Sequence, residues 1–320
     1  MPEVLSFDKA LKQIGAEPCS ILLGNGFSSR YCAYTTLLEK SGLPIDAPCR
    51  RLFDRMDTKN FEQVIRALED ASVIARTYGN DEQADILVRD AELVRKDLIT
   101  AIQAAHPTHL DKMLDVIPSC VEFLNPFKCV FTTNYDLLLY WVVIKSGGRF
   151  GDGFLNAKDA DGFRGPFQED NRCNVYNVHG GLQLFVRTDG ELSKRLAGPD
   201  GGIEAIGRTI AEQKRFPLYV AEGNTESKQR RIHESRYLTL CFQRLKESSG
   251  CFFVYGSAAA DNDAHIYDAL FRSKIKHLYF CIYDQSELPS IDGRLSNYQK
   301  SNSSKIPYTF VDSKSAGVWE

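Results

Sequence analysis

The chain has 320 residues and a formal net charge of −3, from 39 Lys and Arg against 42 Asp and Glu. Its composition, 43% hydrophobic and 25% charged, is typical of a folded protein. The longest apolar run, Leu137–Ile144, is far shorter than the roughly 20 residues of a bilayer span, and the N-terminus lacks a signal-peptide pattern. We therefore expect a cytoplasmic protein that neither spans a membrane nor binds nucleic acid broadly.

Five short apolar runs, each ending at Gly, Asn, His or Asp, predict buried strands. Their continuous apolar character, rich in β-branched and aromatic residues, is typical of strands that are covered on both faces. Helical patterns follow several of them, so the sequence predicts an α/β fold with a mainly parallel sheet. The predicted strands are 20–23, 128–132, 174–178, 251–255 and 277–283, and the helices among them are 135–143, 230–246 and 263–271.

A long helical stretch separates the first two predicted strands. Residues 61–71 and 81–106 carry apolar side chains at helical spacing, and Pro107 ends the second segment. One crossover helix normally suffices in a parallel sheet, so we interpret residues 29–118 as an inserted helical subdomain within a single domain of residues 1–320. The Gly- and Asp-rich segment 147–170 is expected to form a long surface loop.

The nine cysteines are scattered along the chain and contain no Cys-x-x-Cys pair. An odd number of cysteines without a secretory signal indicates reduced thiols. The absence of paired cysteines also removes the usual pattern of a structural zinc site. We therefore expect no bound metal.

Four motifs follow predicted strands directly. Gly24-Asn25-Gly26-Phe27-Ser28 could let a backbone approach a pyrophosphate, although a tight turn explains it equally well, and Ser29 breaks the dehydrogenase fingerprint. Thr132-Thr133-Asn134-Tyr135-Asp136 offers polar side chains that could bind a ligand or cap a helix. The third motif is Val178-His179-Gly180-Gly181, and the fourth runs from Tyr255 through Gly256 and Ser257 to Asp261.

These motifs should meet at one edge of the sheet, because ligands of open α/β sheets bind outside the carboxyl ends of the strands. Of the six histidines, only His179 stands at such a place. The other five are His106, His109, His233, His265 and His277, and their positions in helices, at helix ends or at a strand edge predict structural roles.

The order of the four motifs resembles that of the sirtuin-type fold, and more closely that of the bacterial sirtuin-like proteins of anti-phage defence. The stretches Phe131–Leu138 and Pro217–Gly223, followed by Lys228 and Tyr237, support this resemblance, which covers about residues 18–30 and 117–285. It implies a Rossmann-like sheet of sirtuin type. The missing Cys-x-x-Cys pairs and deacylase loop argue against acyl-lysine chemistry and leave hydrolysis of NAD as the implied activity.

The resemblance also implies roles for particular residues. Asn134 would position the attacking water or the ribose next to nicotinamide, and His179 would act as general base. The dinucleotide would be bound by Gly24, Asn25, Gly26, Ser28, Thr133, Asp136, Gly180, Gly256, Ser257 and Asp261. No metal would be needed.

The leading expectation is an NAD-depleting defence hydrolase that is inactive until triggered. Two alternatives stay open. One is a zinc-free NAD-dependent deacylase or ADP-ribosyltransferase, and the other is a catalytically silent module that senses NAD or ADP-ribose. By resemblance we expect a homo-oligomer, with a P-loop ATPase or translocase as a possible partner. The helical insert is expected to cover the nicotinamide pocket and to supply an assembly surface.

Overall fold

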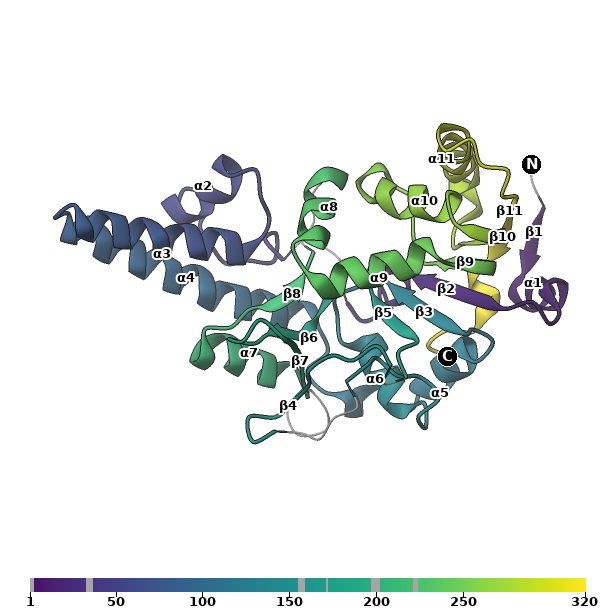
Figure 1. Ribbon diagram of the computed structural model, residues 1–320, viewed down its shortest axis with the longest axis horizontal. Coiled ribbons are helices and arrows are strands. Elements are labelled where there is room, and N and C mark those ends of the chain that lie inside the picture. Colours follow the sequence, from purple (N-terminus) through teal and green to yellow (C-terminus); the bar gives the residue numbers. More distant parts are fainter. Residues whose placement is uncertain (1–2, 33–36, 155–158, 171, 197–201, 221–223) are drawn as a thin grey trace.

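A seven-stranded sheet lies at the centre of the molecule (Figure 1). The structure is a computed structural model that describes residues 3–32, 37–154, 159–170, 172–196, 202–220 and 224–320. Every strand pair in this sheet is parallel, which confirms the predicted α/β fold with a Rossmann-like sheet. In spatial order the strands are β1 (Val4–Ser6), β11 (Tyr308–Asp312), β10 (Lys274–Ile282), β9 (Ser249–Tyr255), β2 (Cys19–Leu23), β3 (Cys129–Thr132) and β5 (Val175–Asn177).

Helices cover both faces of this sheet, which explains why its strands are apolar throughout. Along β2, Ile21 and Leu23 belong to one buried cluster, and Leu22 between them belongs to another. The first cluster lies against α1, α5 and α6, and the second against α9, α10 and α11. The helices are α1 (Phe7–Ile14), α2 (Pro48–Arg55), α3 (Phe61–Thr77), α4 (Asp81–Ala105), α5 (Ile117–Leu124), α6 (Leu138–Lys145), α7 (Gly202–Gln213), α8 (Thr225–His233), α9 (Arg236–Lys246), α10 (Ala264–Phe271) and α11 (Leu288–Ser301).

The chain leaves the sheet after β2 and returns at β3 through the predicted helical insert. Helices α3 and α4 run side by side and project from the body of the molecule (Figure 1). Each begins at an asparagine, Asn60 or Asn80, whose side chain accepts a hydrogen bond from the first turn. The two helices predicted from the sequence are therefore present, and α3 extends six residues beyond its predicted end.

A second sheet was not predicted. Its four strands are antiparallel, in the order β4 (Phe163–Arg164), β7 (Leu192–Arg195), β6 (Gly180–Val186) and β8 (Pro217–Tyr219). Segment 147–170, expected to be a surface loop, contributes β4 and buries Phe150, Phe154 and Phe163. Most of the described part of this segment is irregular, as predicted for a loop, but it does not lie wholly at the surface; residues 155–158 lie outside the described residues.

Two predicted helices have different bounds. The single helix expected over 230–246 is two helices, because α8 ends at His233 and Ser235 begins a new helix, its hydroxyl accepting a hydrogen bond from Leu238 N of α9. The helix expected from 135 begins at Leu138, whose amide donates to the Asp136 carboxylate at 2.7 Å. In the described part of the chain, no helix is long and apolar enough to cross a lipid bilayer.

Candidate functional site

The structure brings the four strand-end motifs to one edge of the sheet. They follow β9, β2, β3 and β5, which are consecutive neighbours in the sheet. Because these strands are parallel, their carboxyl ends lie together. The candidate site therefore combines segments that are more than two hundred residues apart in sequence.

Asn134 is held rigidly at this edge. Its side-chain Nδ2 donates to the carbonyl oxygen of Gly24 at 2.9 Å and to Ser28 Oγ at 3.1 Å. These two acceptors fix which end of the amide is nitrogen, so Oδ1 faces the other way. That oxygen is buried and has no hydrogen-bond partner among the described residues. An unpaired buried acceptor is costly, so Asn134 Oδ1 is available to accept from a bound molecule.

His179 is paired with a second histidine that the sequence did not single out. Its Nε2 lies 3.0 Å from Nε2 of His265, and the two rings are stacked with 5.2 Å between their centroids. The first residue lies after β5 and the second in α10. The sequence correctly predicts that His265 lies in a helix, but it does not predict that the ring of His265 contacts the candidate base directly.

The hydrogen bonds of this pair define its tautomers. The imidazole of His179 also donates to the backbone of Thr133, so its Nε2 carries no proton when the ring is neutral. His265 must then donate from its own Nε2, which leaves its Nδ1 as an acceptor. This Nδ1 is buried without a hydrogen-bond partner in the described structure. The pair can therefore accept a proton at Nδ1 of His265 without losing an existing hydrogen bond.

A carboxylate and an ammonium group lie next to the two histidines. Asp263 precedes α10 but does not cap it, and its carboxylate accepts from Lys228 Nζ at 2.7 Å. Burial opposes ionisation of Asp263, but the neighbouring imidazoles and Lys228 still bring its pKa below the ordinary value. The ionised carboxylate can therefore stabilise a positive charge on either histidine.

Burial keeps both imidazoles neutral. Removal from water lowers the pKa of His179 to about 3, although the nearby Asp263 acts in the opposite direction. The same cause lowers the pKa of His265 to about 4. His179 is thus neutral at cellular pH, as the sequence interpretation assumed, but it is a much weaker base than an exposed histidine.

His179, Asp263 and His265 also have donor atoms within 4.8 Å of one another, as a metal site would require. Two imidazole nitrogens and one carboxylate are suitable ligands for a transition metal. However, the Lys228 ammonium already neutralises the Asp263 carboxylate, and it would repel a divalent cation. The ion pair therefore favours the metal-free interpretation of this cluster.

The glycine-rich segment after β2 packs tightly against the turn after β9. The amides of Gly24 and Gly26 donate to the carbonyl oxygens of Tyr255 and Gly256, at 2.8 and 2.7 Å. A Cβ atom on Gly26 would lie 2.5 Å from the Cα of Gly256, so no side chain fits there. The glycines are explained by this close approach, and these two amides are already used within the protein.

A pocket of about 740 Å³ opens beside this turn. Gly26, Gly256 and Ser257 line it, together with residues that the sequence analysis did not single out. Among the latter are two cationic side chains, Arg30 and Lys314, and two acidic ones, Glu287 and Glu320. A pocket of this size can hold a drug-sized ligand, and these cations suit a phosphate-bearing one. Asn134 and His179 are not among its lining residues, and both are 4% exposed.

The C-terminal segment closes one side of this pocket. The indole of Trp319 donates to the carbonyl oxygen of Phe27, and Arg30 donates to the carbonyl oxygen of Trp319. The ring of Trp319 also packs on Phe27 and Tyr31, with centroids 5.1 and 5.4 Å apart. The segment therefore fixes the glycine-rich turn in place. No local motif in the sequence indicated this contact.

The remaining predicted binding residues have structural partners. Ser257 Oγ lies 2.6 Å from the hydroxyl of Tyr267, and Asp261 accepts from Tyr298 at 3.4 Å. Gly180 has a positive φ of 75°, and a Cβ atom there would lie 2.1 Å from the carbonyl oxygen of Leu218. Asn25, which begins the short helix η1 (Asn25–Phe27), accepts from the amide of Ser28 through its carbonyl.

Asp136 and His106 tie the helical insert to the sheet. Besides capping α6, Asp136 has a donor atom within 4.8 Å of those of Cys32 and His106. His106 Nε2 accepts from the amide of Leu137 at 2.9 Å. Burial lowers the pKa of His106, so this imidazole stays a neutral acceptor. The arrangement fits the capping interpretation of Asp136 better than contact with a ligand.

Comparison with known proteins yields a family and no named relative. No curated protein matches the chain significantly. Residues 21–319 match the family DUF4917, which is described as a domain of unknown function. The match begins in β2 and ends in the C-terminal segment, so it includes the helical insert, the antiparallel sheet and the candidate site. The chain belongs to the DUF4917 family.

Proposed function

We propose that the protein hydrolyses NAD at the bond between nicotinamide and ribose. The observation that carries this proposal is the clamped amide of Asn134, whose free Oδ1 lies in the same strand-end edge as the buried His179–His265 pair. The pocket beside Gly256 offers room and cationic side chains for the rest of the dinucleotide. The order of the four motifs, which resembles that of sirtuin-like proteins, supports the same substrate.

The chemistry requires a group that positions water and an environment that excludes the rest of the solvent. When the C1′–N bond breaks, nicotinamide leaves with the bonding electrons and positive charge develops on the ribose ring. Asn134 Oδ1 would accept a hydrogen bond from the attacking water or from a ribose hydroxyl. Its fixed orientation costs no reorganisation during the reaction. Burial of Asn134 provides a low-dielectric site in which this hydrogen bond is strong.

The attacking water must lose a proton as its oxygen bonds to C1′. His179 Nε2 would receive it once its hydrogen bond from His265 breaks, because in the resting pair this nitrogen accepts from His265 Nε2. Asp263 would stabilise the resulting positive charge. A base of low pKa suits a reaction in which the leaving group departs early, because the water then attacks a strongly electrophilic carbon.

Biological role and assembly follow from the resemblance alone. The hydrolase would deplete NAD in antiviral defence, as a homo-oligomer that is inactive until triggered and that can work beside a P-loop ATPase or translocase. Both candidate catalytic side chains are buried, which supports control of access to the site.

The proposal is tested by incubating the purified protein with NAD and measuring nicotinamide and ADP-ribose by chromatography. Asn134→Ala and His179→Ala should each reduce turnover on the order of 10²–10³-fold, as for loss of one oriented polar group. The matched controls Asn297→Ala and His233→Ala change exposed residues and should keep full activity. Circular dichroism checks that each variant is folded.

Three results would contradict the proposal in different ways. Full activity of His179→Ala would reject the assigned base. Absence of NAD turnover by every oligomeric form of the wild-type protein would reject the hydrolase. NAD consumption that requires an added acylated peptide would instead identify a deacylase.

A further inference from the structure

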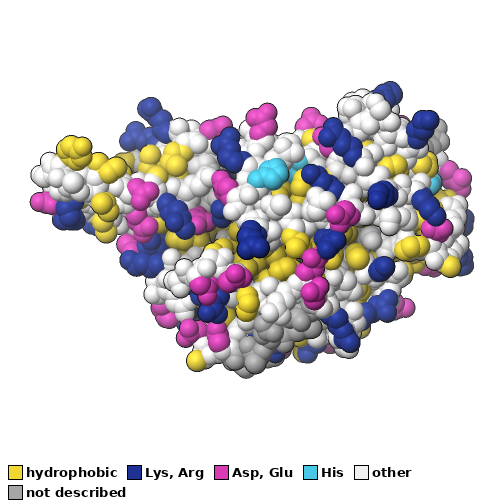
Figure 2. Space-filling view, in the orientation of Figure 1, with side chains coloured by type: hydrophobic (Ala, Val, Ile, Leu, Met, Phe, Trp, Pro, Cys, Tyr) yellow, Lys and Arg dark blue, Asp and Glu magenta, His cyan; other side chains and the backbone are white. Residues whose placement is uncertain are grey.

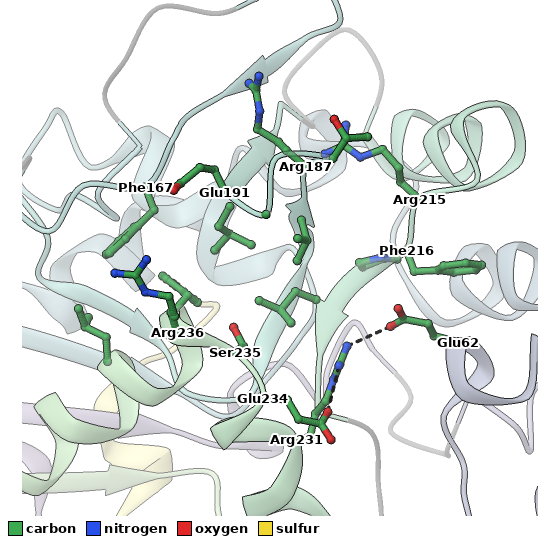
Figure 3. Close-up of a pocket in the computed structure, with 18 of the residues that line it drawn as sticks. Glu62, Phe167, Arg187, Glu191, Arg215, Phe216, Arg231, Glu234, Ser235 and Arg236 are labelled. Atoms are coloured by element: carbon green, nitrogen blue, oxygen red, sulfur yellow. Dashed lines mark hydrogen bonds and ion pairs between the residues drawn. The ribbon is translucent and has the colours of Figure 1, made fainter. Parts of the chain in front are cut away.

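A second pocket lies away from the proposed NAD site, between the antiparallel sheet and helices α3, α8 and α9 (Figure 3). Its volume is about 780 Å³, within the range of small-molecule sites. Strands β6, β7 and β8 contribute one side, and the start of α9 contributes the other. It shares no lining residue with the pocket beside Gly256.

The charge of this pocket is unbalanced. Six of its lining side chains are cationic and three are acidic. Two of the acids, Glu62 and Glu234, both pair with Arg231, at 3.0 and 3.4 Å (Figure 3). Glu62 also pairs with Arg66, and two acids outside the lining, Asp189 and Glu92, pair with Arg187 and Lys214. Among the described residues, Arg215 and Arg236 have no ion pair, and Glu191 is the remaining acid, so the pocket carries a small positive excess.

Two arginines, Arg187 and Arg215, lie on one side of the pocket; Arg187 pairs with Asp189 at 3.2 Å, whereas Arg215 has no ion pair among the described residues. Arg215 hydrogen-bonds only neutral groups in the described structure, Ser193 Oγ at 3.3 Å and Gln213 Oε1 at 3.4 Å, and its Nε has no partner. Burial and the nearby charge of Arg187 lower the pKa of Arg215, although three aspartates partly offset the effect. An anion placed between the two guanidinium groups would relieve this repulsion and pair with both.

Arg236 provides a third cation beside an aromatic surface. It is exposed and has no ion pair among the residues that the structure describes. In Figure 3 its guanidinium extends toward Phe167, whose ring packs edge-on against Tyr237 with centroids 4.9 Å apart. Phe216 lies across the same pocket. Cations next to accessible aromatic rings suit a ligand that combines negative charge with a flat ring.

We propose that this pocket binds a nucleoside phosphate, with the phosphates at Arg187 and Arg215 and the base against the aromatic side near Arg236. The pocket volume is large enough for the whole ligand. The arginines would bind its phosphates, and the aromatic side chains would contact its base. The planar guanidinium groups can bind phosphate oxygens in pairs, and the charge of Arg215, which hydrogen-bonds only neutral groups, suits an anionic ligand. This site is additional to the one proposed for NAD.

The test measures binding of UTP, ATP and inorganic pyrophosphate to the full chain by calorimetry, without NAD. UTP and ATP should bind, and Arg187→Gln/Arg236→Gln should weaken both by about tenfold for each arginine. Both residues are exposed, so this variant should keep its fold. The matched control Arg89→Gln/Lys96→Gln removes two exposed positive charges from α4, outside the pocket, and should bind like the wild type.

The outcomes separate this site from the proposed hydrolase. No binding of UTP or ATP at millimolar concentrations would overturn the proposal, as would equal binding by the wild type and the pocket variant. Pyrophosphate binding as tight as that of UTP would overturn the assignment of a nucleoside. Because NAD is absent from the measurement, failure of NAD hydrolysis would leave a positive binding result unchanged.

Discussion

At the scale of single residues, burial decides the chemistry of the candidate base. An exposed histidine has a pKa near 6.5 and exchanges protons readily at neutral pH. His179 and His265 instead share one hydrogen bond away from water, and both remain neutral. The rate of NAD hydrolysis should consequently show no inflection near pH 6.5, because the essential imidazole loses its neutral form only at much lower pH.

The same two pKa values predict how stability depends on pH. In the unfolded chain both imidazoles take up protons below about pH 6.5, whereas in the folded chain they do so only near pH 3 and 4. The unfolded state thus binds more protons between about pH 6.5 and 4, and the free energy of unfolding falls as the pH is lowered through this window. His106, whose pKa is also lowered, acts in the same direction.

The expected slope is at most about 1.4 kcal/mol per pH unit for each imidazole. Urea unfolding at pH 7, 6 and 5 measures it. His265→Phe should reduce the slope, whereas His233→Ala, which changes an exposed histidine, should not. Equal unfolding free energies at pH 7 and pH 5 would show that these histidines are hydrated in the folded protein.

The charge of Lys228 predicts the response to metal removal. Its ammonium lies 2.7 Å from the carboxylate that would complete a site with the two histidines. We expect EDTA to change neither the melting temperature nor NAD turnover, and mass spectrometry of the purified protein to detect no stoichiometric metal. Lys228→Met provides the contrast, because it frees Asp263 and should raise the affinity of the cluster for Zn²⁺. Stoichiometric zinc in the wild-type protein would contradict the metal-free interpretation.

At the scale of elements, the sequence predicts the parallel sheet well and the antiparallel sheet poorly. Strands β9 and β10 each end in a continuous apolar run, Cys251–Tyr255 and Leu278–Ile282, a pattern that is typical of buried strands. By contrast, β4 has two residues and β8 three, and both depend on partners distant in sequence. Such short strands are formed by tertiary contacts, because their own propensity is too weak to specify them.

The candidate site divides in the same way. Asn134 and His179 directly follow apolar runs that predict strands, so their placement at one edge could be predicted from the sequence. Asp263 precedes α10 and His265 lies in its first turn, and both residue types have common structural explanations at these positions. Only the tertiary fold, which brings α10 next to the residue that follows β5, places them beside His179. These neighbours of His179 are distant in sequence, so they can be identified only from the folded structure.

Replacing glycine by alanine should have opposite effects on the free energy of unfolding at Gly26 and at Gly293. Gly26→Ala places a Cβ atom 2.5 Å from the backbone of Gly256 and must separate the two turns, so we expect a loss of about 1–3 kcal/mol in the free energy of unfolding. Gly293→Ala lies inside α11, where the new Cβ meets nothing within 4 Å, and should gain about 0.5–1 kcal/mol. Chemical denaturation measures both. Equal effects would show that the two turns are not in close contact.

At the scale of the whole molecule, the helical insert is the most asymmetric feature. The α3–α4 hairpin extends well beyond the sheet, and Figure 2 shows apolar side chains at its free end. They belong to Val73, Ile74 and Tyr78, which are 65%, 60% and 86% exposed. At the base of the hairpin, Glu62 pairs with Arg231 of α8, the helix that also carries Lys228 of the candidate site. The hairpin therefore connects an apolar tip to the surroundings of His179.

Exposed apolar side chains at the end of a projecting element are favourable only if another surface covers them. Because we expect a homo-oligomer, Ile74→Asp/Tyr78→Asp should shift the protein toward monomer without lowering its melting temperature, since neither side chain is buried in the chain itself. Size-exclusion chromatography with light scattering measures the mass, and Ile45→Asp, which is 86% exposed elsewhere in the insert, is the matched control. If the tip variant keeps the mass of the wild type, or if the control loses it equally, assembly does not use this tip. If the mass falls and NAD turnover falls with it while NAD binding persists, assembly controls the proposed hydrolase through the hairpin.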